Sequence, residues 1–278
     1  MKNGLITGFH RSGTTLVCHL LNKVPNVVAL DEPLDVASFR FLVFDEIVAY
    51  IENFLHDQRR SIRELGFAIS KTQSGRVPCN QLSDDHDGHV RKSVVDGNLL
   101  SVDNIDDRDF DLYIKHPAVF TALLGSLENY YPCYVSIRNP LSILLSWRAT
   151  PFNVSQGRAP AAEMIDPRLA QRLDRESKVL SRQLILIDYF FSRYAEARSV
   201  KIVRYEDLVS SGGRALVALE PRAEILDEPL VSRNDRYLRH DDAVKQILHS
   251  LLTADNACWD FYSKNEVIAL AAQAGILI

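Results

Sequence analysis

This sequence has few cysteines, no long apolar run and no excess of positive charge, and each of these features excludes a class of protein. The chain has 4 cysteines in 278 residues, and none of them forms a CxxC pair, so a disulfide framework is not expected. No stretch approaches the roughly 20 consecutive apolar residues that a membrane helix requires. The formal net charge of −4 provides no overall field that would attract nucleic acid or an anionic membrane. We therefore expect a cytoplasmic protein with no membrane span and no nucleic-acid partner.

The order of the apolar segments predicts an α/β fold. Short apolar runs typical of buried strands occur at residues 5–9, 27–30, 112–115, 134–137 and 200–203. Helical periodicity occurs between and after them, at residues 13–24, 39–65, 117–128, 140–149, 167–197 (one long helix or two), 241–250 and 264–274. Because parallel strands need a crossover, this order predicts three layers: a mostly parallel central sheet with helices on both faces. The length suits a single domain over residues 1–278.

Residues 69–111 form the longest stretch without a regular pattern. The segment is rich in aspartate and lacks clear periodicity, which favours a long surface excursion that acts as a lid or faces the substrate. His86 and His89 lie within it, but no further metal ligands follow at a recognisable spacing. We expect no metal site.

A glycine turn near the amino terminus is the first candidate site. It joins the first predicted strand to the first helix, and Gly8 and Gly13 have the spacing of a phosphate-binding P-loop. Glycine lets the backbone approach an anion, and the free N–H groups of a helix start favour negative charge. Thr14 stands where a P-loop that binds nucleoside triphosphates has lysine, and the cation of this loop is Arg11. The expected fold is therefore P-loop-like, with a loop suited to one phosphate or phosphosulfate. A glycine turn without a ligand is the alternative.

A second candidate site follows the predicted strand at residues 134–137. Arg138 ends that strand, Asn139 can cap the next helix, and Pro140 suits its first turn. Arginine offers a fork of hydrogen bonds to a phosphate, and Ser146, further along the helix, adds a donor. Alone, the pattern also fits an exposed arginine and an unrelated serine. Together with the glycine turn, it predicts one ligand with two separated anionic groups at the carboxyl edge of the sheet.

These motifs resemble those of sulfotransferases that use 3′-phosphoadenosine 5′-phosphosulfate (PAPS). Residues 11–16, RSGTTL, are similar to the 5′-phosphosulfate loop of that family, and residues 138–140, RNP, with Ser146 are similar to its 3′-phosphate motif. Residues 204–208, RYEDL, resemble a third family segment near the nucleotide. The resemblance implies PAPS as co-substrate, with no required metal, and implies the following binding residues: Arg11, Ser12, Gly13, Thr14, Thr15, Arg138, Ser146 and Tyr205.

Within this superfamily the closer likeness is to carbohydrate and tyrosylprotein sulfotransferases, whose loops also carry arginine where cytosolic sulfotransferases carry lysine. Glu32, in a Glu-Pro segment after the second strand, resembles their proposed catalytic base, and Asp31 is the adjacent competitor. His116 is the second choice of base, because cytosolic sulfotransferases use a histidine after a comparable strand. The resemblance places Arg11 and Lys115 near the transferred group. The implied catalytic residues are therefore Glu32, Lys115, Arg11 and His116.

The activity that this resemblance implies is transfer of a sulfuryl group from PAPS to a hydroxyl of a carbohydrate, glycolipid or hydroxylated metabolite. The glycine-rich carboxyl-terminal segment of cytosolic sulfotransferases and the membrane anchor of Golgi relatives are both missing, so neither subfamily's acceptor carries over. Residues 232–236 are interpreted as an ordinary surface loop, with closure over the nucleotide as the alternative. A P-loop nucleotide kinase, opposed by the missing lysine, and a non-catalytic nucleotide-binding module are the competing functions.

Overall fold

Five parallel strands form the centre of the protein. The structure, a computed structural model, describes residues 1–84, 90–106 and 109–276. The strands have the order β2-β5-β1-β6-β7, and each neighbouring pair is parallel. Their bounds lie close to the expected positions: β1 (Asn3–Gly8), β2 (Val27–Asp31), β5 (Asp111–Lys115), β6 (Cys133–Ile137) and β7 (Lys201–Arg204).

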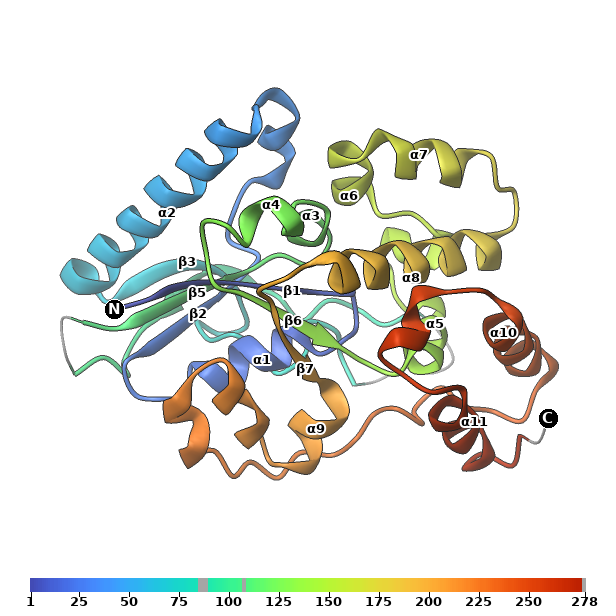
Figure 1. Cartoon of the computed structure of the whole chain (residues 1–278). Helices are drawn as coiled ribbons and strands as arrows, with labels where there is room; N and C mark the ends of the chain where they lie inside the picture. Colours follow the sequence, from blue (N-terminus) through green and yellow to red (C-terminus); the bar gives the residue numbers. More distant parts are fainter. Residues whose placement is uncertain (85–89, 107–108, 277–278) are drawn as a thin grey trace.

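Helices cover both faces of this sheet (Figure 1). Two lie below it in that view, α1 (Thr14–Leu21) and α9 (Tyr205–Ser210), and three lie above it, α3 (Pro117–Ala122), α4 (Leu124–Leu127) and α8 (Val179–Glu196). The other α-helices are α2 (Phe44–Leu65), α5 (Pro140–Arg148), α6 (Pro160–Ile165), α7 (Pro167–Asp174), α10 (Asp242–Thr253) and α11 (Lys264–Ala272). The expected α/β architecture, with a mostly parallel sheet between two helical layers, is confirmed.

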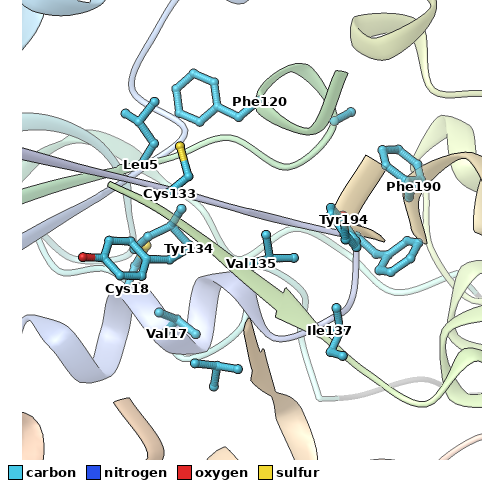
Figure 2. Close-up of a cluster of buried hydrophobic side chains, with 14 of the residues drawn as sticks. Leu5, Val17, Cys18, Phe120, Cys133, Tyr134, Val135, Ile137, Phe190 and Tyr194 are labelled. Carbon is cyan, nitrogen blue, oxygen red and sulfur yellow. The ribbon is translucent and has the colours of Figure 1, made fainter. Parts of the chain in front are cut away.

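The core lies on both faces of the central strands. Figure 2 shows Leu5 of β1 and Phe120 of α3 on one side of β6, and Val17 of α1 on the other. Strands that are covered twice have no polar face, which explains why their sequences are nearly continuous apolar runs. Each large apolar side chain buried in this way contributes about 1.5–3 kcal/mol.

Residues 69–111 are more regular than expected. β3 (Phe67–Thr72) and β4 (Gly97–Ser101) pair as a two-stranded antiparallel sheet. In β3 the exposed positions include Phe67 and Ile69, and the buried positions are small or polar: Ala68, Ser70 and Thr72. This is the reverse of the alternation that predicts a half-buried strand. The expected lack of regular structure was therefore wrong for these two strands, while the lid role stays a prediction.

Three predicted helical stretches are divided. The stretch 39–65 contains the end of a 3₁₀ helix, η1 (Val36–Phe41), followed by α2. The stretch 117–128 consists of the short helices α3 and α4, and 167–197 consists of two helices, α7 and α8, one of the two alternatives. In the part of the chain that the structure describes, no helix is both long enough and apolar enough to cross a membrane.

Candidate functional site

The carboxyl ends of the parallel strands bring the predicted site residues to one edge of the sheet. The last residues of β1, β2, β5, β6 and β7 are Gly8, Asp31, Lys115, Ile137 and Arg204. β1 has β5 on one side and β6 on the other. The crossover from β1 to β2 and the one from β6 to β7 therefore run in opposite directions. Such a reversal opens a crevice between the carboxyl ends of β1 and β6, where ligands bind in open α/β sheets.

The turn between β1 and α1 depends on its glycines. Gly13, the N-cap of α1, has a φ of 95°, and a Cβ at this position would lie 2.9 Å from Cδ2 of Tyr205. A Cβ at Gly8 would collide with the carbonyl oxygen of Ser136. No side chain caps α1, so its first N–H groups are available to an anion.

The binding residues expected from the sequence converge on one cavity, here called the first cavity. Its volume is about 300 Å³, and its lining includes Arg11, Gly13, Thr14, Thr15, Arg138, Ser146 and Tyr205. The structure thus brings together the turn after β1, the arginine after β6 and the start of α9. Ser12 is the exception, because its buried hydroxyl donates to the carbonyl oxygen of Phe9 over 3.0 Å and serves the turn itself.

Arg11 connects the two predicted anion sites. Its Nε donates to Oγ of Ser146 over 3.3 Å, and its Nη1 donates to Oδ1 of Asn80 over 3.0 Å. Burial, together with the charges of Arg91 and Arg138, lowers the pKa of Arg11 to about 9. Like charges this close repel one another, so an anion in the first cavity would stabilise the whole group of arginines.

Arg138 is buried, and protein oxygens already surround its guanidinium. Nη1 donates to the carbonyl oxygen of Arg11 over 3.0 Å, Nε donates to Oδ1 of Asn234 over 2.7 Å, and Nη2 donates to the carbonyl oxygen of Arg233. The guanidinium also lies 4.3 Å from the ring centroid of Tyr205. A phosphate that binds Arg138 must therefore share or replace some of these contacts.

Residues 232–236 form a wall of the first cavity, which corrects their interpretation as an ordinary surface loop. Arg233 and Arg236 line the cavity, and their Nη1 atoms donate to the carboxylate of Asp84 over 3.2 Å and 2.9 Å. Arg91 lies 3.6 Å from the same carboxylate. The hydrogen bond from Arg236 lowers the pKa of Asp84 although burial opposes it. A carboxylate thus sits among three arginines beside the predicted nucleotide site.

A second cavity borders the same turn. It has a volume of about 360 Å³, and His10, Glu32 and His116 line part of its wall. The consecutive residues His10 and Arg11 therefore face different cavities. Two of the catalytic residues expected from the sequence, Glu32 and His116, meet at the second cavity.

Glu32 is held by two lysines. Its Oε1 accepts a hydrogen bond from Nζ of Lys115 over 2.8 Å, and its Oε2 accepts one from Lys71. Lys115 is only 1% exposed and also lies 2.5 Å from the fully buried carboxylate of Asp31. Burial would raise the pKa of Glu32, but the charges of Lys115 and Lys71 hold it well below its ordinary range. Glu32 is therefore ionised and weakly basic, and two carboxylates balance the charge of Lys115.

His116 already accepts a hydrogen bond. Its Nε2 lies 3.0 Å from the backbone N–H of Leu34, and this bond uses the Nε2 lone pair and leaves the ring hydrogen on Nδ1. Burial lowers the pKa of His116 to about 3, so the ring is neutral near pH 7. In this arrangement the ring can donate a hydrogen bond but has no spare lone pair.

His10 has an unused ring nitrogen. Its Nδ1 is buried and has no hydrogen-bond partner in the part of the chain that the structure describes. Nε1 of Trp147 donates to the backbone carbonyl of His10 over 2.8 Å and holds the turn in place. Burial lowers the pKa of His10 to about 4. His10 was not among the predicted site residues, although its position inside the glycine turn was a usable signal.

Other residues at the two cavities gave no signal in the sequence. They come from the end of β3 and the segment after it, and they contact or line the site: Lys71, Cys79, Asn80, Gln81, Asp84 and Arg91. His86 and His89 lie outside the described residues. Among the residues that are described, no group of three or more His, Cys, Asp or Glu side chains is arranged to hold a metal ion.

Comparison with known proteins gives a distant structural likeness. Neither a family model nor a curated protein sequence matches this chain. Among solved structures, the chain is similar to sulfotransferase STF1 from Mycobacterium tuberculosis H37Rv, with a TM-score of 0.36 and 13% sequence identity, over 98% of this chain and 76% of that one. A likeness at this TM-score does not by itself indicate a shared function.

Proposed function

We propose that this protein transfers a sulfuryl group from PAPS to a hydroxyl of an acceptor molecule. The observation that carries the proposal is the position of Arg11 and Arg138, which follow different strands and line one cavity beside the start of α1. PAPS has two separated anionic groups, a 5′-phosphosulfate and a 3′-phosphate, and this pair of cations suits both. The motif resemblance supports the same ligand.

Each residue of the first cavity has a role in this proposal. Arg11 and the N–H groups and hydroxyls of Thr14 and Thr15 hold the phosphosulfate, and Arg138 and Ser146 hold the 3′-phosphate. The ring of Tyr205, already packed against Gly13, lies beside the nucleotide. Negative charge grows on the departing phosphate oxygen during transfer, and fixed cations and N–H donors are the main means of stabilising it. The donor carries no triphosphate, so the proposal requires no metal ion.

The second cavity supplies the acceptor side of the reaction. The acceptor oxygen forms a bond to sulfur while the bond between sulfur and the bridging phosphate oxygen breaks. The electron pair leaves with adenosine 3′,5′-bisphosphate, and the hydroxyl proton passes to a base. Glu32 and His116, the two bases expected from the sequence, are at the wall of this cavity, and Lys115 balances the charge of Glu32. Carbohydrates, glycolipids and hydroxylated metabolites are the candidate acceptors.

Two measurements test this proposal. Calorimetry with adenosine 3′,5′-bisphosphate in the presence of a chelator is expected to show metal-independent binding. Radiolabelled PAPS is expected to lose its label to a hydroxylated acceptor when a panel of alcohols, phenols and sugars is supplied. Metal-dependent ATP consumption without bisphosphate binding would instead identify a P-loop kinase. Tight bisphosphate binding with no transfer to any acceptor would identify a non-catalytic module.

A further inference from the structure

We propose that Asn80 and Gln81 are positioning residues of the sulfuryl transfer: Asn80 orients Arg11 toward the phosphosulfate, and Gln81 orients the carboxylate of Glu32. The two residues are consecutive in the chain and belong to the segment after β3, which was expected to act as a lid or face the substrate. Their role rests on the proposed function, and it names the residues through which this segment serves the site.

Asn80 holds one branch of the Arg11 guanidinium. Its Oδ1 accepts hydrogen bonds from Nη1 of Arg11 over 3.0 Å and from the backbone N–H of Leu82 over 3.2 Å. Nε of Arg11 donates to Oγ of Ser146 over 3.3 Å. Among the residues that the structure describes, Nη2 of Arg11 donates to no partner. Two of the three nitrogens are therefore held, and the third remains for an oxygen of the ligand in the first cavity.

Gln81 holds the carboxylates of Asp31 and Glu32. It is 8% exposed, and its Nε2 donates to Oδ2 of Asp31 over 2.6 Å and to Oε1 of Glu32 over 3.4 Å. An amide NH₂ group has two N–H donors, one for each carboxylate. Lys115 and Lys71 also bind Glu32, but they bring positive charge. Gln81 fixes the direction of the Glu32 carboxylate without adding a charge to the cluster.

Backbone contacts hold this part of the segment in place. Hydrogen bonds join residues 81–83 to residues 92–94 in an antiparallel pairing. Leu82 is 2% exposed, and its carbonyl oxygen accepts a hydrogen bond from Nη2 of Arg91 over 2.7 Å. The backbone N–H of Arg91 donates to the carbonyl oxygen of Ala149, at the end of α5, over 3.1 Å. Asn80 and Gln81 thus start from an anchored backbone, which a positioning residue requires.

A single peptide bond links the supports of the two cavities. Asn80 supports Arg11 at the first cavity, and Gln81 supports Glu32 at the wall of the second. Transfer needs the attacking and departing oxygens roughly in line, and a misplacement of about 1 Å can lower a rate by about 100-fold. Because Asn80 and Gln81 are neighbours in the chain, they fix the phosphosulfate cation and the carboxylate relative to one another.

A double-mutant cycle tests whether Asn80 acts through Arg11. Calorimetry gives the Kd for adenosine 3′,5′-bisphosphate of wild type, Asn80→Ala, Arg11→Met and the double variant. Asn80→Ala alone is expected to raise the Kd about 3- to 10-fold, as for the loss of one hydrogen bond. In the Arg11→Met background the same change should alter the Kd by less than about twofold, because methionine cannot donate to Asn80. Asn98→Ala, at an exposed position of β4, is the matched control and should keep the wild-type Kd.

Transfer kinetics with radiolabelled PAPS test Gln81. Gln81→Met has a similar size but no amide donor, and we expect kcat to fall by about 10- to 100-fold with an unchanged Kd for the bisphosphate. Gln81→Glu places a third carboxylate beside Asp31 and Glu32. Like charges raise the pKa of a carboxyl group, so the acid limb of the pH profile of kcat/KM should move to higher pH. Gln73→Met and Gln73→Glu, at an exposed position of the same segment, are the matched controls and should behave as wild type.

The outcomes for the variants and for wild type separate the positioning roles from the proposed function. An equal effect of Asn80→Ala in both backgrounds, or no effect in either, would overturn the positioning of Arg11. Wild-type kcat in Gln81→Met together with an unmoved pH profile in Gln81→Glu would overturn the positioning of Glu32. In both cases binding and transfer by wild type leave the proposed function intact. If wild type neither binds the bisphosphate nor consumes PAPS, the proposed function fails and the positioning roles fail with it.

Discussion

The carboxylate of Glu32 lies 2.8 Å from the ammonium of Lys115, although the two residues are 83 positions apart in the chain. Glu32 follows β2 and Lys115 ends the neighbouring strand β5. The backbone N–H of Glu32 donates to the carbonyl oxygen of Lys115 over 2.9 Å. Glu32 has a φ of 47°, a left-handed conformation that surrounding contacts must hold in place. Two side chains that were expected to act separately on substrate therefore form one ionic cluster with Asp31 and Lys71.

The ionic cluster predicts a large loss of stability when its central cation is removed. Lys115→Met leaves the carboxylate of Asp31, which is 0% exposed, without its partner. Breaking one side of a buried pair costs about 3–5 kcal/mol, and urea unfolding at neutral pH measures the change. Lys23→Met is the control, because Lys23 is 39% exposed in its pair with Glu228 and should lose at most about 1 kcal/mol. Equal losses in the two variants would contradict the cluster's role.

Arg11 is predicted to bind the nucleotide through its charge. Arg11→Gln keeps a polar side chain but removes the cation, and a hydrogen bond to a charged group is worth about 1.5–3 kcal/mol. We expect the Kd for adenosine 3′,5′-bisphosphate to rise by about 10- to 150-fold in calorimetry. Arg60→Gln, at a side chain that is 62% exposed, should leave the Kd unchanged. Wild-type affinity in Arg11→Gln would remove Arg11 from the binding site.

Gly13 is predicted to tolerate no side chain. In Gly13→Ala the alanine would have to adopt a φ of 95°, which is strained for any residue with a side chain. Its methyl group would also lie only 2.9 Å from Cδ2 of Tyr205. Backbone strain of this kind costs about 1–3 kcal/mol, so we expect a lower melting temperature and weaker bisphosphate binding. Gly125→Ala is the matched control, since a Cβ there meets nothing within 4 Å and alanine favours the helix. A neutral Gly13→Ala would contradict the close packing of the turn.

The buried histidine His116 predicts a loss of stability in acid. Burial lowers its pKa from 6.5 to about 3, so between these values the unfolded chain binds more protons than the folded one. This group therefore does not reduce the free energy of unfolding above pH 6.5, and it reduces that free energy progressively as the pH falls toward 3. At about pH 5 this one group lowers the free energy of unfolding by about 2 kcal/mol relative to its value at neutral pH.

His116→Gln isolates this effect. Glutamine can still accept the hydrogen bond from Leu34 but does not titrate. The free energy of unfolding of the variant should therefore fall less than that of wild type between neutral and mildly acidic pH. His56→Gln, at a side chain that is 78% exposed, should fall as much as wild type does. Identical pH dependence of all three proteins in urea titrations would count against a buried, neutral His116.

Asp84 is predicted to compete with the nucleotide for the arginines of the first cavity. Asp84→Asn removes the charge that Arg233 and Arg236 bind, which leaves them free to interact with a phosphate. Because Asp84 is 63% exposed, its pairs are worth at most about 1 kcal/mol, so the Kd for the bisphosphate should fall by up to about fivefold.

The control for Asp84 is an exposed aspartate with a similar partner. Asp103→Asn removes a carboxylate that is 69% exposed and bound to Arg76, and calorimetry should give the wild-type Kd. Weaker binding in Asp84→Asn would show that Asp84 positions the arginines rather than competing with their ligand.

The strands and the glycine turn could be predicted from the sequence because they depend mainly on residues that are close together in the chain. The apolar runs predicted β1, β2, β5, β6 and β7 because strands covered on both faces need no polar positions. The spacing of Gly8 and Gly13 predicted the turn before α1, since left-handed or crowded backbone positions require glycine. Because parallel strands end at one edge, the same reasoning placed Arg11 and Arg138 near each other.

Only the tertiary structure decided which groups surround those residues. Glu32 and Lys115 form one ion pair because β2 and β5 are neighbours in the sheet. The order of strands in a sheet cannot be predicted from the local periodicity of the sequence. Asp84 and Arg91 reach the first cavity from a segment that was predicted to act as a lid or face the substrate, but whose pattern did not indicate which of its residues would do so. The unpaired state of His10 Nδ1 likewise depends on what packs around the turn, because burial and pairing are properties of the folded neighbourhood and not of the residue itself.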